Sequence, residues 1–418
     1  MKLSNRWFQL VASLIAMIMI ANLQYSWTLF VEPLRAANGW RLSDVSLAFT
    51  LFILFQTWVQ PLDGWLIDRM GPRGFISAAG VLCGLGWAGL AYATTLPELY
   101  ALYALAGIGA ALVYSGSIGS ALKWFRDRRG LASGIMAAGF GGGTALFIPI
   151  ISSTIRSSGY KTAFFWTGLV QGFTILIVAQ FLRHPAQESA TGRGANQDSR
   201  SANLQVRHLT TLEMLRTPRF YSLYAMFVLM ATGGLLVTAQ AGPMAKTWGI
   251  SLGGLALATS LSPIANGASR IFWGWASDRI GRETTMAIAF LLQAICLLLV
   301  LTLGHLSSAW FAATLVLVYF TWGEIYSLFP STAADRFGTR HATSNYSGLY
   351  TAKGVASIIG GVVAARLYEQ FGSWSACFYG SAVLALIAAV MAFRLRNAPS
   401  LHGSVTVDGD IVAPVLAK

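Results

Sequence analysis

The chain has 418 residues, of which 55% are hydrophobic and only 11% are charged, and its mean hydropathy is +0.58. Soluble globular proteins carry about 25% charged residues, so this composition excludes an ordinary soluble protein and indicates a membrane protein. The three cysteines are far apart in apolar runs, a pattern that fits neither a disulfide framework nor a metal site. We expect no metal and no cofactor.

Twelve apolar segments follow one another along the chain, and each is long enough to cross a bilayer, which takes roughly 20 residues. They centre near residues 19, 54, 84, 109, 142, 173, 230, 263, 294, 319, 354 and 384. The first has a basic start, but its apolar part is too long for a signal peptide, so we interpret it as an uncleaved helix. The sequence therefore predicts an all-α membrane protein with twelve transmembrane helices.

One long polar stretch divides these segments into six plus six. We predict an N-terminal six-helix bundle over residues 1–183, a cytoplasmic central loop over 184–218, a C-terminal six-helix bundle over 219–395 and a cytoplasmic tail over 396–418. The 43 glycines gather inside the apolar segments. Small residues allow transmembrane helices to approach closely, so we assign these glycines to packing rather than to ligand binding.

The basic residues are distributed unevenly between the two sides of the membrane. With the N-terminus in the cytoplasm, 21 of the 29 Lys and Arg residues fall on the cytoplasmic side, six on the opposite side and two inside the spans. This is a positive-inside pattern, which predicts that both termini are cytoplasmic, as for a bacterial inner-membrane protein. It also accounts for the net charge of +13 without a nucleic-acid partner.

A short motif occurs twice at matched positions. "GWLIDRMGPRG" (64–74) closes the second segment and "GWASDRIGRET" (274–284) closes the eighth, 210 residues later. The repeat resembles the signature loop of the major facilitator superfamily, although Pro72 stands where a basic residue is usual. The resemblance implies two parallel six-helix bundles. It also implies a cytoplasmic latch, formed by Asp68, Arg69, Arg73, Asp278, Arg279 and Arg282. A role in topology alone is the alternative for these residues.

Three isolated charges lie inside the spans of the C-terminal half. Arg270 is the only charged residue in 247–277, Glu324 the only one in 306–334 and Lys353 the only one in 342–365. Intramembrane charges are costly and usually face a functional cavity. Glu324 can pair with one of the two cations, which we favour, or it can stay unpaired and carry a proton. Either case leaves a net positive site, so the sequence predicts an anionic substrate.

The resemblance narrows to the oxalate/formate antiporter family on the stretches "NRWFQLV", "QYSWTLF", "SRIFWGWASDRIGR", "FTWGEIYSLFPS" and "YTAKGVAS". It implies that Arg270 and Lys353 hold the carboxylates of the substrate. It also implies aromatic walls, for which we take Tyr25, Tyr114, Trp322, Tyr326 and Tyr350. Three positions depart from the family pattern: Phe140 replaces a tyrosine, Tyr350 replaces a tryptophan, and Glu324 adds an acid.

These features favour a monomeric exchanger of small carboxylates, with oxalate moving inward and formate outward by alternating access. The alternative is a proton-coupled transporter of another monocarboxylate, with Glu324 as the proton carrier. We expect no enzyme, because all five histidines lie outside the spans and no histidine-based site can form in the membrane. A carboxylate sensor is disfavoured, since the sequence carries no added signalling domain. The expected partners are the carboxylate anions and the lipid bilayer.

Overall fold

A computed structural model of the chain describes residues 5–125, 129–183, 209–338 and 341–396. Within its helices, the side chains of residues 64–70, 122–123, 129–131, 133 and 342–343 are outside the description. Every regular element among the described residues is a helix. The expected all-α fold is confirmed. Most of the expected central loop (184–208) and nearly all of the expected tail (397–418) lie outside the described residues.

The N-terminal half consists of α1 (Arg6–Tyr25), α2 (Thr28–Asn38), α3 (Leu42–Trp58), α4 (Gln60–Gly89), η1 (Leu90–Tyr92), α5 (Leu96–Trp124), α6 (Arg129–Gly142), η2 (Gly143–Leu146) and α7 (Ile148–Phe181). After the short α8 (Thr211–Leu215), the C-terminal half consists of α9 (Pro218–Thr247), α10 (Leu252–Ile280), α11 (Arg282–Leu303), α12 (Ser308–Trp322), α13 (Ile325–Phe337), α14 (Ala342–Ser357), η4 (Ile358–Val363), α15 (Ala364–Phe371) and α16 (Ser375–Arg396). The segment η4 is a π-helical turn that joins α14 to α15.

Ten stretches of the described residues are long and apolar enough to cross a membrane. One of them, Gly134–Phe181, contains the expected fifth and sixth segments, which meet at Gly159, where φ is +83°. The expected eighth segment is α10, which is helical but carries Ser262, Asn266 and Arg270 among its buried residues and is therefore less apolar. The twelve expected segments thus correspond to helical parts of the fold. Helices suit a lipid bilayer because they satisfy their own backbone hydrogen bonds.

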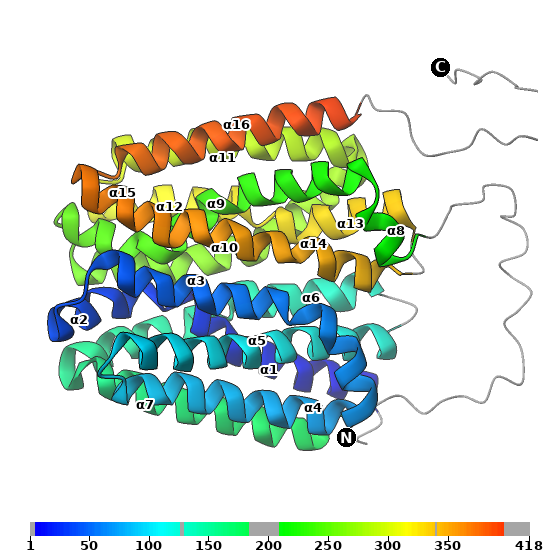
Figure 1. Ribbon diagram of the computed structural model, residues 1–418, viewed down its shortest axis with the longest axis horizontal. Coiled ribbons are helices and arrows are strands. Elements are labelled where there is room, and N and C mark those ends of the chain that lie inside the picture. The colour runs from blue at the N-terminus through cyan, green and yellow to red at the C-terminus, as the bar shows by residue number, and fades with distance from the viewer. Residues whose placement is uncertain (1–4, 126–128, 184–208, 339–340, 397–418) are drawn as a thin grey trace, which may run out of the picture.

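The two halves lie side by side with their helices running in the same general direction (Figure 1). Helices α3 and α6 of the N-terminal half pack against α14 and α10 of the C-terminal half. One end of the molecule carries α2 and α15, and the other carries α8, the start of α1 and the end of α16 (Figure 1). We call them the α2/α15 end and the α8 end.

The repeat between the halves is visible in the backbone. Gly71 closes the first copy of the signature motif with φ of +67°, and Gly281 closes the second with φ of +88°. Gly39 and Gly249, also 210 residues apart, have φ of +69° and +66°. Because L-residues rarely adopt this region, glycine is required at these turns.

Glycines inside the helices bring backbones together. A methyl group on Gly168 of α7 would lie 2.4 Å from the backbone nitrogen of Ala88 in α4, and one on Gly84 would lie 3.1 Å from Cα of Gly172. Between the halves, a methyl group on Gly141 would lie 3.1 Å from Cα of Gly267. The assignment to helix packing is confirmed at these positions, whereas a methyl group on Gly119 or Gly134 would have no neighbour within 4 Å among the described residues.

Candidate functional site

Lys353 reaches from α14 across the boundary between the halves. Its Nζ donates to Gln24 Oε1 on α1 and to Gln56 Oε1 on α3, both at 2.9 Å, and to the Tyr350 hydroxyl at 3.3 Å. The side chain is fully buried. The ammonium group is therefore held by neutral oxygen atoms, two of which belong to the other half.

Arg270 also reaches across the boundary, from α10. Its Nη1 donates to the backbone oxygen of Ala137 on α6 at 2.8 Å, and its Nη2 donates to Asn266 Oδ1 at 2.9 Å. The guanidinium carbon lies 4.4 Å from the centre of the Tyr326 ring, a favourable cation–π contact. Lys353 Nζ lies 5.8 Å from the same ring centre. Tyr326 thus connects the two cations.

The aromatic residues expected around the substrate form one continuous series. The ring of Tyr25 lies 5.6 Å from that of Phe140, which lies 5.3 Å from Tyr114. Tyr114 stacks on Tyr350 at 5.7 Å. Tyr350 lies 6.2 Å from Tyr326, which meets Trp322 edge-on at 5.6 Å. The five predicted aromatic residues and Phe140 therefore share one buried site with both cations.

The site carries two positive charges and no acid in contact with them. Neither Arg270 nor Lys353 forms an ion pair with an acid among the described residues. Their hydrogen bonds go to neutral amide, hydroxyl and carbonyl oxygens, which are weaker partners than a carboxylate, and Arg270 Nε has no partner among the described residues. An anion with two carboxylates matches this arrangement in charge.

Glu324 lies apart from this cluster, at the interruption between α12 and α13. It is fully buried, and neither carboxylate oxygen has a hydrogen-bond partner among the described residues. The pairing with Arg270 or Lys353 that we favoured from the sequence is not present in this structure. The helix geometry that separates Glu324 from the face of Trp322 and Tyr326 explains why it misses the site.

The expected latch residues lie at the α8 end as far as they are described. Asp278 binds Arg282 at 2.7 Å, and Arg282 contacts Asp335 at 3.3 Å, all within the C-terminal half. Arg279 lies over the ring of Trp275 at 4.3 Å. Arg73 is exposed, whereas the side chains of Asp68 and Arg69 are outside the description. The proposed latch between the halves therefore stays a prediction.

Several residues of the site were missed from the sequence. Gln24 and Gln56 bind Lys353, and Asn266 binds Arg270 and also donates from Nδ2 to the Tyr319 backbone oxygen at 3.2 Å. Each is a neutral polar residue inside an apolar span, a signal that alone is weak because many such residues only bond their own helix.

Two ion pairs join the halves at the α2/α15 end. Glu32 on α2 accepts from Lys246 on α9 at 2.5 Å, and Glu369 on α15 accepts from Arg41, which precedes α3, at 2.8 Å. The Ser43 backbone N–H also donates to Glu369 at 2.8 Å. The hydrogen bond and charge of Glu369 raise the pKa of the Arg41 guanidinium above its ordinary value. Each half thus supplies one acid and one cation to this pair of contacts, which we call the cross-half ion pairs.

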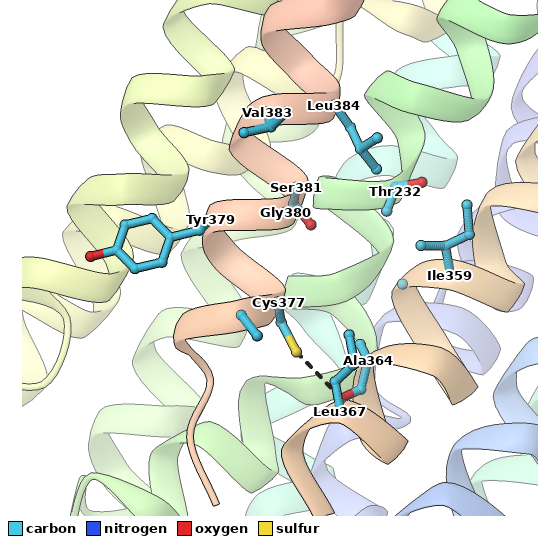
Figure 2. Close-up of a pocket in the computed structure, with 12 residues that line it drawn as sticks. Thr232, Ile359, Ala364, Leu367, Cys377, Tyr379, Gly380, Ser381, Val383 and Leu384 are labelled. Carbon is cyan, nitrogen blue, oxygen red and sulfur yellow. Dashed lines mark hydrogen bonds between the residues drawn. The ribbon is translucent and has the colours of Figure 1, made fainter. Parts of the chain in front are cut away.

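A cavity of about 410 Å³ lies elsewhere in the C-terminal half (Figure 2). It is open to the outside and is lined by α9, η4, α15 and α16, through residues such as Thr232, Ile359, Leu367 and Leu384. Tyr379 points away from the other lining residues in Figure 2 and is largely exposed. Because neither central cation lines this cavity, it is separate from the candidate site.

Comparisons with known proteins show the family to which the chain belongs. The family model described as "Major Facilitator Superfamily" matches residues 12–241 and 221–415. The oxalate:formate antiporter of Oxalobacter formigenes is 40% identical over 390 residues, which cover 93% of this chain and 91% of that protein. The uncharacterized MFS-type transporter YhjX of Escherichia coli is 26% identical, with 85% and 86% covered. Monocarboxylate transporter 12-B of Danio rerio is 24% identical, with 80% and 75% covered. By these matches, the chain belongs to the major facilitator superfamily and, within it, to the oxalate/formate antiporter family.

Proposed function

We propose that this protein exchanges small carboxylates across the bacterial inner membrane, with oxalate moving inward and formate outward. The observation that carries the proposal is the pair of buried cations, Arg270 and Lys353, which meet no acid among the described residues. The name of the relative from Oxalobacter formigenes supports oxalate and formate as the substrates.

Each of the two cations binds one carboxylate of the substrate in this proposal. The planar fork of Arg270 suits one carboxylate in a bidentate arrangement, and the ammonium of Lys353 acts as a point charge for the other. At about 4 Å and an effective dielectric near 20, one such contact contributes about 4 kcal/mol before desolvation. A dianion replaces the neutral hydrogen-bond partners at both cations with carboxylates, whereas a monoanion replaces them at only one cation. The site therefore favours oxalate over formate in the state described here.

Binding at this place couples the substrate to the arrangement of the halves. Lys353 is tied to α1 and α3, and Arg270 is tied to α6. A carboxylate that takes over these donors releases contacts between the halves, as rocking around a central site requires. We place both termini in the cytoplasm on the basis of the positive-inside pattern, so that the α8 end is cytoplasmic. We further propose that one chain is sufficient for transport.

Counterflow of labelled oxalate in proteoliposomes, with a panel of unlabelled carboxylates as competitors, tests this function. We expect oxalate and formate to compete, and amino acids and sugars not to. Arg270→Lys keeps the charge but loses the fork, so we expect a loss of roughly tenfold or more in oxalate exchange. Arg366→Lys, at an exposed position, is the matched control. Normal exchange by a folded Arg270→Lys variant contradicts the carboxylate role of Arg270.

Lys353→Arg tests the second cation in the opposite way, because a larger head must fit among Gln24, Gln56 and Tyr350. We expect this variant to lose exchange as well. If both charge-retaining variants transport normally, the two cations have structural roles only.

A transporter of another small monocarboxylate is the second candidate, favoured by the similarity to monocarboxylate transporter 12-B. The same competition panel separates the two candidates. Strong competition by monocarboxylates, with none by oxalate, assigns the second function.

A further inference from the structure

Glu324 is a buried acid that carboxylate binding by Arg270 and Lys353 does not use. An ionised carboxylate without hydrogen bonds in an apolar interior is strongly disfavoured. Both oxygens of Glu324 lack a hydrogen-bond partner among the described residues, and its side chain is fully buried. In this state the side chain is therefore protonated and neutral.

The groups around Glu324 offer it no counter-charge in direct contact. The acids on the neighbouring elements, Asp278, Glu283 and Asp335, contact Arg282 or Arg336 at the α8 end. On α9 the ionisable groups are Arg219, Tyr221, Tyr224 and Lys246, toward the ends of the helix. The remaining titratable groups on the packed elements are Arg270 and Arg279 on α10, Cys296 on α11, Tyr319 on α12, Tyr326 on α13, and Tyr346, Tyr350 and Lys353 on α14.

Short connections nevertheless join Glu324 to the substrate site. Asn266, which binds Arg270, packs against Gly323, the residue before Glu324; a methyl group on Gly323 would lie 2.7 Å from the Asn266 backbone oxygen. Tyr326, two residues after Glu324, carries Arg270 on its ring. A change in the partner of Arg270 therefore acts on both sides of Glu324.

We propose that Glu324 binds a proton that travels with the dianion and is released when the monoanion is carried. The inference rests on the proposed exchange of carboxylates. With oxalate bound, two cations and two negative charges cancel, so Glu324 stays neutral. With formate bound, one positive charge remains, and loss of the Glu324 proton to water restores neutrality. Buried charge that is not balanced is costly, so both loaded states favour a net charge of zero.

One oxalate dianion and one proton enter, the proton being taken from water by the Glu324 carboxylate on the outer side and returned to water on the inner side. One formate anion leaves. The exchange then moves no net charge, whereas exchange without the proton moves one negative charge inward.

Proteoliposomes loaded with formate and a pH-sensitive dye test this proposal. External oxalate is added with or without an inside-negative potential set by potassium and valinomycin. For the wild type we expect acidification of the lumen, and an oxalate accumulation that changes by less than about twofold with the potential. For Glu324→Gln we expect no acidification. A potential of about 100 mV acting on one moving charge should then lower accumulation roughly fiftyfold.

Asp63→Asn is the matched control, because Asp63 is a buried acid of the N-terminal half that accepts from Ser115. It should behave as the wild type. Loss of acidification in Asp63→Asn but not in Glu324→Gln would show that Asp63 carries the proton in place of Glu324. That result overturns the proposal. So does a wild type that shows no acidification and a strong dependence on potential, a result that needs no variant to fold. Oxalate self-exchange, which moves no net charge in either case, separates this failure from failure of the proposed function.

Discussion

The two ends of the molecule use their charges differently. At the α2/α15 end, Glu32 and Glu369 each bind a cation of the other half. At the α8 end, the ion pairs among the described residues, Asp278 and Asp335 with Arg282 and Glu283 with Arg336, stay within the C-terminal half. The first set holds two bodies together, and the second holds the helices of one body together.

This difference indicates that the two halves are closed against each other at the α2/α15 end. Side chains away from the ion pairs support it at the same end: Gln240 on α9 donates to Ser46 on α3 at 3.0 Å, and Thr50 donates to the Ser357 backbone oxygen at 2.9 Å. In a transporter that alternates, contacts of this kind must form and break once in every cycle. Charges that must separate are best kept weak and partly hydrated, as the exposed Arg41 and Lys246 are.

The largest expected effect comes from blocking the closure at the α2/α15 end. A methyl group on Gly242 of α9 would lie 2.1 Å from the backbone oxygen of Thr28 on α2. Overpacking costs about 1–3 kcal/mol, so Gly242→Ala should disfavour the closed end by roughly five- to a hundredfold and reduce exchange accordingly. The measurement is labelling of Ser46→Cys by a membrane-impermeant thiol reagent, in a background without Cys83, Cys296 and Cys377.

Gly253→Ala is the matched control for Gly242→Ala. Its nearest neighbour would be Ser251 Oγ at 3.9 Å, and the position is exposed. Equal labelling rates at Ser46→Cys in both glycine variants contradict the tight closure described here.

A smaller effect is expected from the cross-half ion pairs. The double variant Glu32→Gln, Glu369→Gln removes both acids, and partly exposed pairs contribute about 0.2–1 kcal/mol each. We expect labelling of Ser46→Cys to increase by a few-fold. Glu283→Gln, which loses an ion pair inside one half, should leave the labelling rate unchanged. An equal increase in both variants would show that the two ends do not differ in the way described.

The smallest effect concerns the signature loops at the α8 end. Asp278→Asn loses its contact with Arg282, and Asp68→Asn alters the matching position of the first motif. We expect slower exchange, by a few-fold, with the order of competing anions unchanged. The check is the carboxylate competition panel applied to each variant. A reordered panel would mean that these loops contact the substrate.

The sequence predicted the features that depend on local pattern. Arg270, Lys353 and the aromatic residues are visible as exceptions within apolar spans, and Gly71 and Gly281 are visible in a repeated motif. All of them lie where that pattern requires. Such features depend on the cost of placing a residue in lipid, which acts at one position at a time.

Features that depend on distant partners could not be predicted in this way. Glu369 and Arg41 are 328 residues apart, and Lys353 and Gln24 are 329 apart, so no spacing indicates either contact. The predicted ion pair of Glu324 with Arg270 or Lys353 was wrong for a related reason. Its presence in the same half as two cations suggested an ion pair, but both of its oxygens are without a partner among the described residues.

The π-helical turn η4 has a consequence for which side chains α14 and α15 present to the other half. Lys353 and Glu369 are 16 positions apart, and in an unbroken α-helix their side chains would differ in direction by about 160°. A π-turn accommodates one additional residue, which reduces the difference to about 60°. Both side chains accordingly meet the N-terminal half, Lys353 at the centre and Glu369 at the α2/α15 end. A single surplus residue thus turns the central cation and the acid of the α2/α15 end toward the same half.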